Sequence, residues 1–554
     1  MRGRYVFMQS LVAHGVDRIF GNPGTTESPL LNSLPDYPGI EYIVALHEGI
    51  AVGAASFYYQ ASGKIPAVNL HVAPGLGNAI GMMYGALKAN SAMLVTAGQQ
   101  DTRMRLREPL LGHDLAAMAA PVSKWSVQAE SADELGLLLH RAFKIASDPP
   151  AGPVFIALPI NVMEQETQAP PLPASALHRA AMPDPAGIDT LAALILGSSR
   201  PAIVAGDDVA RAGAVATLVA LAEFAGAPVA AEGLRHQVSF PSDYPNARPV
   251  LPFDATAIRK ALGQADLVLL VGGPFFEEVW YAEQSPFPDG AVVVQIEEAH
   301  HRLAFNHALD AGLIGALPAA LGQLLGALEA GAGADFRRAA TARNGALEEA
   351  KQREQAEHES RLERGWDRRP MSMARALAEI HRGAPADAAV VEEAITAGPD
   401  LARSFVFRAP GDYFSGRGGG IGQGLAGAIG VKLASPDRPV MAISGDGSAM
   451  YSIQALWTAA RHGLAIVFII LANREYRILK HNMDTYRQRF GAESNQGYPH
   501  MDLDAPALNF VDLARGMGVE GVRIDDPDAL AAAVASAFAG GRPSLVEVLI
   551  EGKR

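Results

Sequence analysis

Short apolar runs alternate with Ala- and Leu-rich helical segments from one end of the chain to the other. Examples of such runs are GPVFIALPI (152–160), ADLVLLVGG (265–273) and RPVMAIS (438–444). Strands of a parallel sheet that are covered by helices on both faces are apolar throughout, so this alternation is typical of α/β domains. The sequence therefore predicts an α/β protein built from doubly wound parallel sheets.

Two stretches interrupt the alternation and predict three domains. Residues 163–187 contain repeated prolines, which favour an extended linker. Residues 337–370 are charged and poor in apolar side chains, which indicates a solvated helix between domains. The first and third segments have the same kind of strand, turn and helix layer without a visible sequence repeat. The expected boundaries are domains at 1–165, 187–336 and 370–554, with linkers at 166–186 and 337–369.

The composition excludes several functional classes. With 49% apolar and 19% charged residues over 554 positions, the chain can bury a large core. The net charge of −13 and the lack of a basic block argue against a nucleic-acid partner. The absence of cysteine excludes disulfides and thiolate metal sites. No membrane-spanning stretch and no signal peptide are expected, so we predict a cytoplasmic protein.

The segment GDGSAMYSIQALWTAARHGLAIVFIILAN (445–473) carries the clearest chemical signal. Asp446 follows a buried strand inside a Gly-Asp-Gly turn, and Asn473 ends the next strand. Open parallel sheets bind ligands at the carboxyl ends of their strands. A carboxylate, an amide oxygen and a nearby carbonyl are ligands that Mg²⁺ prefers, and phosphate oxygens commonly complete its shell. We therefore predict a magnesium–diphosphate anchor; the alternative is an ordinary strand-turn-helix joint in which Asp446 caps the helix.

The same segment resembles the metal–diphosphate signature of thiamine-diphosphate-dependent enzymes. The likeness covers nearly the whole chain and is weaker in the middle segment. The stretches FGNPGTTE, ALHEGIAVGAASFYYQASG, NLHVAPGLGNAIG, TAGQQ and GDGSAMYSIQALWTAA look most like those of benzoylformate decarboxylases. The resemblance implies three α/β domains, which are pyrimidine-binding, middle and diphosphate-binding, with thiamine diphosphate and Mg²⁺ as cofactors.

The resemblance also implies roles for individual residues. Asp446, Asn473 and the carbonyl of Glu475 would hold Mg²⁺, while Glu48 would hydrogen-bond the aminopyrimidine ring and activate the cofactor. The alternative for Glu48 is a carboxylate that interacts with the helix dipole. The remaining cofactor contacts would come from Ile421 beneath the bent cofactor and from Gly445, Gly447, Ser448 and Tyr476 near the diphosphate. Ile421 could equally be an ordinary core residue.

Two further residues match positions that face the substrate in this group. His71 would orient the substrate carboxylate and move protons, although a histidine at a strand end is often structural. Thr25 would donate a hydrogen bond to the carboxylate, or satisfy the local turn. Because a pyrimidine contact and a metal site of this family normally come from different chains, we expect a homodimer with shared sites, assembled into a homotetramer.

The sequence departs from the decarboxylase pattern in two places. A second active-site histidine is missing where Val279 and Trp280 stand, and His47, His113 and His481 are candidates to replace it. The stretch after Asn473 is basic and polar, so Arg477 or Lys480 could face an acidic group of the substrate. The alternative is that these side chains lie on a solvated helix face.

These observations predict an enzyme that decarboxylates a small-molecule 2-oxo acid to an aldehyde. The principal alternative is a carboligase or aldehyde lyase that makes or cleaves 2-hydroxy ketones. A catalytically silent subunit is a third possibility, which the presence of Glu48, Asp446 and Asn473 together argues against. A structural FAD in the middle domain, as in acetolactate synthases, is a minor one.

Overall fold

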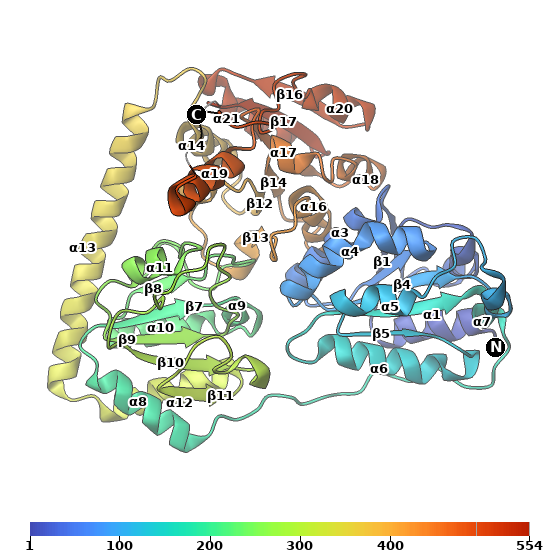
Figure 1. Cartoon of the computed structure of the whole chain (residues 1–554), viewed down its shortest axis with the longest axis horizontal. Coiled ribbons are helices and arrows are strands. Elements are labelled where there is room, and N and C mark those ends of the chain that lie inside the picture. The colour runs from blue at the N-terminus through green and yellow to red at the C-terminus, as the bar shows by residue number, and fades with distance from the viewer. Residues whose placement is uncertain (493, 495, 553–554) are drawn as a thin grey trace. The chain divides into compact units, whose positions relative to one another are not determined.

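The computed structural model describes residues 1–492, 494 and 496–552. The chain divides into two compact units (Figure 1). The first contains Met1–Ala176, Arg369–Thr396 and Ser415–Arg554, and the second contains Leu177–Arg368 and Ala397–Phe414. Two parallel sheets belong to the first unit, apart from Tyr413 and Phe414 of one edge strand, and one belongs to the second. This arrangement confirms the predicted fold of three parallel α/β layers.

The first sheet is formed by the N-terminal part of the chain, with strand order β2-β1-β3-β4-β6-β5 and parallel pairing throughout. Its central strands are fully buried apolar runs, as expected for strands with helices on both faces. The strands are β1 (Arg18–Gly21), β2 (Glu41–Val44), β3 (Ala67–Leu70), β4 (Met93–Gln99), β5 (Trp125–Gln128) and β6 (Pro153–Pro159). The helices are α1 (Gly3–Ala13), α2 (Ser28–Ser33), α3 (Glu48–Ser62), α4 (Val72–Lys88), α5 (Leu115–Ala119), α6 (Leu135–Ser147) and α7 (Ile160–Glu164).

The C-terminal sheet repeats this topology strand for strand, with the order β13-β12-β14-β15-β17-β16. The strands are β12 (Ala389–Glu393), β13 (Tyr413–Ser415), β14 (Val440–Gly445), β15 (Ile466–Ala472), β16 (Glu520–Ile524) and β17 (Ser544–Leu549). The helices are α14 (Met373–Gly383), α16 (Gln423–Ala434), α17 (Asp446–Ala449), α18 (Ala455–Arg461), α19 (Arg477–Phe490), α20 (Phe510–Gly516) and α21 (Pro527–Ala539). The expectation that the first and third segments share one layer design is therefore confirmed.

Helices α3 and α16 join the two sheets of the first unit, because each presents small residues to the other. A Cβ on Gly430 would lie 2.0 Å from the carbonyl oxygen of Ala54, and one on Gly427 would lie 2.6 Å from the ring of Phe57. Only glycine permits this backbone approach. Both helices begin at segments that carry predicted site residues, so their packing also sets where those residues lie.

The second unit contains a five-stranded parallel sheet of order β11-β10-β9-β7-β8. The strands are β7 (Pro201–Ala205), β8 (Val229–Ala231), β9 (Leu267–Val271), β10 (Val292–Glu297) and β11 (Ala311–Ile314). The helices are α8 (Pro185–Gly197), α9 (Asp208–Arg211), α10 (Val215–Ala225), α11 (Ala255–Leu262), α12 (Leu317–Gly331), α13 (Ala334–Arg364) and α15 (Gly398–Ser404). Helix α13 occupies most of the charged stretch seen in the sequence, and Ala340 is its buried residue.

Across the part of the chain that the structure describes, no helix has both the length and the apolar character needed to cross a bilayer.

Candidate active site

Asp446 lies at the carboxyl end of β14, where the chain turns into α17. Its side chain is buried, and both carboxylate oxygens accept hydrogen bonds from the backbone. Oδ1 accepts from the N–H of Gly447 (2.9 Å) and Oδ2 accepts from the N–H of Arg474 (2.6 Å). The carboxylate is thus held in one orientation by two turns that follow neighbouring strands.

Asn473 follows β15, the strand next to β14 in the sheet. The two strands are parallel, with Gly445 paired to Leu471, so the residues that follow them lie at the same edge. Oδ1 of Asn473 accepts the N–H of Glu475 (3.0 Å). Between these residues Arg474 has a positive φ of 59°, an uncommon conformation for a residue with a side chain, and this turn points its N–H at Asp446.

The surroundings of Asp446 suit a bound cation. Burial raises the pKa of Asp446 to about 6, and the nearby carboxylate of Glu475 adds to the rise. Among the residues that the structure describes, no Lys or Arg forms an ion pair with Asp446. A divalent cation would supply the missing positive charge, and the carboxylate, amide and carbonyl oxygens here are the donor types that Mg²⁺ prefers.

The side chain of Glu475 is committed elsewhere, so its carbonyl is the group left for a metal. Its carboxylate accepts from Lys480 Nζ (2.6 Å) and Arg477 Nε (3.0 Å). Burial opposes the charged form, but these two partners hold the pKa of Glu475 below its ordinary value. Lys480 is buried and also binds Asp502 (2.6 Å). The interpretation that Lys480 lies on a solvated helix face is therefore wrong, and its ammonium group is paired with two carboxylates of this chain.

The predicted diphosphate contacts surround the same turn. Gly445 and Ser448 are half-buried, and Gly447 is buried against the ring of Tyr476. A Cβ on Gly447 would lie 2.5 Å from Cε1 of Tyr476, so a side chain at this position would displace the ring. Tyr476 is held by its backbone N–H, which donates to the carbonyl of Met501 (2.8 Å).

Ile421 lies in the Gly-rich loop before α16, and a residue that sequence reasoning missed holds this loop. Glu393, at the end of β12, accepts the N–H groups of Gly422 (2.7 Å), Gln423 (2.9 Å) and Gly424 (2.9 Å). Burial raises the pKa of Glu393 to about 7, although the three donors favour its charged form. Ile421 itself is half-buried. The sequence shows two consecutive glutamates, Glu392 and Glu393, at the end of β12, and no pattern there indicates that Glu393 binds the Gly-rich loop.

The raised pKa of Glu393 leads to a testable prediction. In the folded protein the Glu393 carboxyl keeps its proton up to about pH 7, whereas its ordinary pKa is 4.5. The unfolding free energy should therefore fall as the pH rises from about 4.5 to about 7. Glu393→Gln cannot titrate. The unfolding free energy of the wild type, relative to this variant, should be up to about 3 kcal/mol greater at pH 5 than at pH 8. Chemical denaturation at both pH values measures it, with exposed Glu520→Gln as the control. An unchanged difference would contradict the assignment.

Glu48 is buried and is the first residue of α3, a helix that packs on the N-terminal sheet. Asn78 donates from Nδ2 to Oε2 of Glu48 (3.0 Å), and Asn22 donates to Oε1 with a longer bond (3.4 Å). Neither asparagine was singled out in the sequence, although both lie in motifs quoted for the resemblance. His47, a candidate for proton transfer, caps α3, because its Nδ1 accepts the N–H of Gly49 (3.0 Å).

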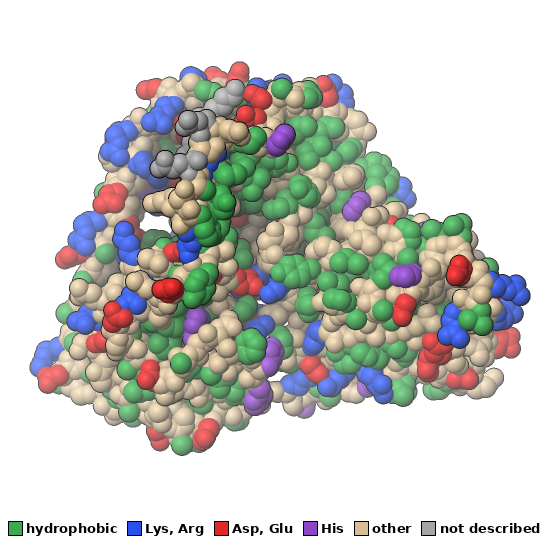
Figure 2. All heavy atoms as spheres, in the orientation of Figure 1, with side chains coloured by type: hydrophobic (Ala, Val, Ile, Leu, Met, Phe, Trp, Pro, Cys, Tyr) green, Lys and Arg blue, Asp and Glu red, His purple; other side chains and the backbone are tan. Residues whose placement is uncertain are grey.

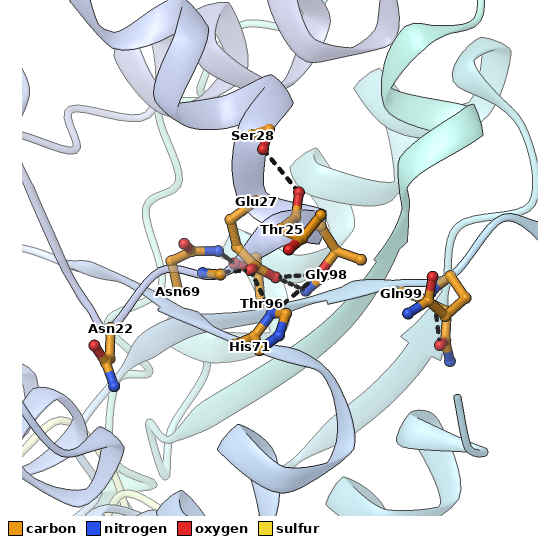
Figure 3. Close-up of polar contacts among 12 residues, drawn as sticks. Asn22, Thr25, Glu27, Ser28, Asn69, His71, Thr96, Gly98 and Gln99 are labelled. Atoms are coloured by element: carbon orange, nitrogen blue, oxygen red, sulfur yellow. Dashed lines mark hydrogen bonds and ion pairs between the residues drawn. The ribbon is translucent and has the colours of Figure 1, made fainter. Parts of the chain in front are cut away.

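His71 lies at the end of β3 and contacts a buried glutamate (Figure 3). Its Nδ1 is 2.8 Å from Oε2 of Glu27 and 3.3 Å from Oγ1 of Thr26. The ring packs against Gly24, where a Cβ would lie 2.2 Å from Nδ1. Thr25 is exposed at the start of the 3₁₀ helix η1 (Thr25–Glu27), and the hydroxyl that joins this cluster is that of Thr26. Sequence reasoning missed Glu27.

The loop that lacks the expected histidine belongs to the second unit. Val279 there is 61% exposed, and its N–H donates to the carbonyl of Phe253 (3.1 Å). The nearest half-buried imidazole along the chain is that of His307, whose ring meets Phe276 and Phe287 edge-on. Burial lowers the pKa of His307, as expected for a ring surrounded by aromatic side chains.

Three family models match this chain in the order of its sheets. They are the N-terminal TPP binding domain (residues 1–118), the central domain (188–324) and the C-terminal TPP binding domain (397–548) of thiamine pyrophosphate enzymes. The chain belongs to the thiamine pyrophosphate enzyme family. Thiamine diphosphate is therefore its cofactor, and the resemblance inferred from the motifs is confirmed.

Members of this family with different named activities match over nearly their whole length. Benzoylformate decarboxylase of Pseudomonas aeruginosa is 34% identical, covering 97% of this chain and 96% of that protein. The acetolactate synthase large subunit IlvG of Mycobacterium tuberculosis is 28% identical, covering 100% and 96%. The structure of a 4-hydroxybenzoylformate decarboxylase from Rhodococcus jostii superposes with a TM-score of 0.85 at 28% identity, covering 100% of both chains.

Proposed function

We propose that this thiamine pyrophosphate enzyme is a Mg²⁺-dependent decarboxylase that converts a 2-oxo acid and a proton to an aldehyde and CO₂. The observation that carries the proposal is the histidine cluster at the end of β3. His71 is fixed by a buried carboxylate through Nδ1, while about a quarter of its side chain stays exposed. An imidazole held in this way can orient a carboxylate and exchange a proton. The match to benzoylformate decarboxylase over 97% of the chain supports the same reaction.

The metal and the diphosphate would bind at the carboxyl edge of the C-terminal sheet. Asp446, Asn473 and the carbonyl of Glu475 would hold Mg²⁺, and Gly445, Gly447, Ser448 and Tyr476 would flank the diphosphate. Ile421, on the loop fastened by Glu393, would support the cofactor from below. When bound, thiamine diphosphate supplies the carbon nucleophile and the electron sink for decarboxylation.

The catalytic side chains would come from the N-terminal sheet. Glu48, held by Asn78, would accept a hydrogen bond from the aminopyrimidine ring and so activate the cofactor. His71 and Thr25 would bind the substrate carboxylate before it leaves as CO₂. His71 would then provide the proton for release of the aldehyde, because it is the imidazole that this site already orients.

A second candidate function is carboligation, in which a second carbonyl compound captures the intermediate before it is protonated. Two observations favour it. An acetolactate synthase large subunit matches the whole chain at 28% identity. In addition, Val279 stands where the resemblance places a second histidine, so one proton donor of the decarboxylase pattern is missing.

We also propose that the active enzyme is a homodimer with shared sites, assembled into a homotetramer. The first unit exposes apolar side chains that a second copy would cover: Leu46 (47% exposed), Tyr84 (40%), Leu110 (82%) and Tyr451 (60%). Figure 2 shows hydrophobic side chains gathered over α17 and α18 and over the region of α3 and α4. Contiguous apolar patches on a folded protein mark interaction surfaces.

A panel of 2-oxo acids from pyruvate through branched acids to benzoylformate tests the reaction. We expect CO₂ and free aldehyde from at least one member, with some leakage to hydroxy ketones. His71→Ala should lower kcat by about 100-fold, the lower end for loss of an acid–base group, with cofactor affinity little changed. The exposed His178→Ala is the matched control. If no 2-oxo acid yields CO₂ while 2-hydroxy ketones are cleaved to aldehydes, the lyase alternative replaces the decarboxylase.

A further inference from the structure

We propose that Glu27 is a positioning residue that fixes His71 in the tautomer with its proton on Nδ1, so that Nε2 is the nitrogen that exchanges protons. The part of this inference that concerns catalysis rests on the proposed decarboxylation. The part that concerns the tautomer rests on the contacts of the folded chain alone and can be measured without cofactor or substrate.

The hydrogen bonds around Glu27 leave one arrangement of protons. Its side chain is 1% exposed and its two oxygens face four donors (Figure 3). Oε1 accepts the N–H of Gly98 (2.9 Å) and the hydroxyl of Thr26 (2.8 Å), and Oε2 accepts the N–H of Gly24 (2.9 Å). The fourth group is Nδ1 of His71 at 2.8 Å. Imidazole is ordinarily a stronger base than a carboxylate, and the three other donors favour the ionised carboxylate, so the proton between the two groups stays on Nδ1 and Nδ1 is the donor.

The backbone around the ring keeps it in this contact. Gly24 packs directly against the imidazole, and the N–H of the same residue binds Glu27. Gly98 lies in β4, the strand next to β3, and joins the carboxylate to the sheet. Movement of the ring away from Glu27 would take one of the four donors from a buried carboxylate, which costs more than the bond itself is worth.

A nearby phenol responds to the same negative charge. Burial, together with the charge of Glu27, raises the pKa of Tyr42. Its hydroxyl donates to Oδ1 of Asn69 (3.3 Å), which lies two residues before His71 in the chain. Tyr42 is therefore a neutral phenol whose hydrogen bond goes to Asn69.

The hydrogen bond to Glu27 gives the two nitrogens of the His71 imidazole different roles. With Nδ1–H donated to Glu27, a neutral ring presents the lone pair of Nε2 and can accept a proton there. The positive charge that forms is then stabilised by the carboxylate 2.8 Å from Nδ1. When Nε2 gives its proton back, the ring returns to the same tautomer without reorienting.

The tautomer of the wild-type protein is the decisive test. Nitrogen-15 NMR of the histidine-labelled, cofactor-free protein, with the His71→Gln spectrum used for assignment, distinguishes protonated Nδ1 from protonated Nε2. We expect the neutral form of His71 to carry its proton on Nδ1. A proton on Nε2 would overturn the inference whether or not the enzyme decarboxylates any 2-oxo acid, and this measurement needs no variant at Glu27.

Glu27→Gln tests the effect on catalysis. Each oxygen of Glu27 accepts one backbone N–H, so in the glutamine variant the side-chain NH₂ must face the N–H of either Gly24 or Gly98. His71 also loses its charged partner. We expect kcat to fall about 10- to 100-fold, as for loss of a group that orients a ligand, with KM little changed and a displaced pH profile. Ser33→Ala, which removes a buried hydrogen bond to Pro29 in the adjacent helix, is the control. An unchanged kcat and pH profile in folded Glu27→Gln would reject the positioning role.

Discussion

Replacing Asp446 with alanine is expected to abolish Mg²⁺-dependent binding of thiamine diphosphate. The carboxylate is the charged member of the proposed ligand set, and burial already raises its pKa to about 6. Loss of a residue that only orients a metal ligand typically costs 10- to 100-fold in affinity, so loss of the ligand itself should cost more than about 100-fold. Titration of the cofactor by tryptophan fluorescence, with and without Mg²⁺, measures the effect.

The control for this experiment is Asp437→Ala, the same change at an exposed position shortly before β14. It should bind cofactor as the wild type does. Circular dichroism and thermal unfolding establish that Asp446→Ala is folded, which matters because two turns donate hydrogen bonds to this carboxylate. Equal affinity of the wild type in the presence and absence of Mg²⁺ would remove the metal from the site.

Replacing Glu48 with glutamine should leave cofactor binding nearly intact and slow activation of the cofactor by about 100- to 10,000-fold, the range for loss of an acid–base group. Glutamine has the same size and can still accept the hydrogen bond from Asn78, but it cannot supply the charge. The readout is the rate of hydrogen–deuterium exchange at the reactive carbon of bound thiamine diphosphate, followed by NMR after rapid quenching.

Glu41→Gln makes the same chemical change on β2, seven positions earlier, and should exchange at the wild-type rate. Wild-type exchange in Glu48→Gln would instead exclude this residue from the mechanism. The same variant tests the proposed sharing of sites between chains. If one chain supplies Glu48 and its partner supplies Asp446, mixing the two inactive variants should restore part of the activity, and hybrid dimers that stay inactive would contradict that arrangement.

The sequence was enough to place two of the predicted metal ligands, Asp446 and Asn473, at one edge of a sheet. Gly-Asp-Gly and the following asparagine could be placed at one sheet edge, because parallel strands end together and each strand was visible as an apolar run. The structure has both turns there, joined by the N–H of Arg474. The roles of these residues as metal and cofactor ligands remain predictions, as do those of Glu48, His71 and Thr25.

Lys480 shows how local pattern misleads. The basic and polar stretch after Asn473 suggested either a solvated helix face or a basic substrate pocket. Lys480 is instead buried between the carboxylates of Glu475 and Asp502. The ion pair with Asp502 joins residues 22 positions apart, because the chain returns from α19 to form a bridge between Glu475 and Asp502. No periodicity within the helix records that return.

The sequence by itself determined the class of the protein, the three parallel layers and the family, because these depend on local periodicity and on short motifs whose residues are neighbours in the chain. Only the tertiary structure decided which polar groups meet. Glu27 and His71 are 44 positions apart, and Glu393 reaches backbone donors 29 to 31 positions away. Such contacts depend on how strands and loops approach one another in space, to within a few tenths of an ångström, and a linear pattern of residue types does not encode that approach.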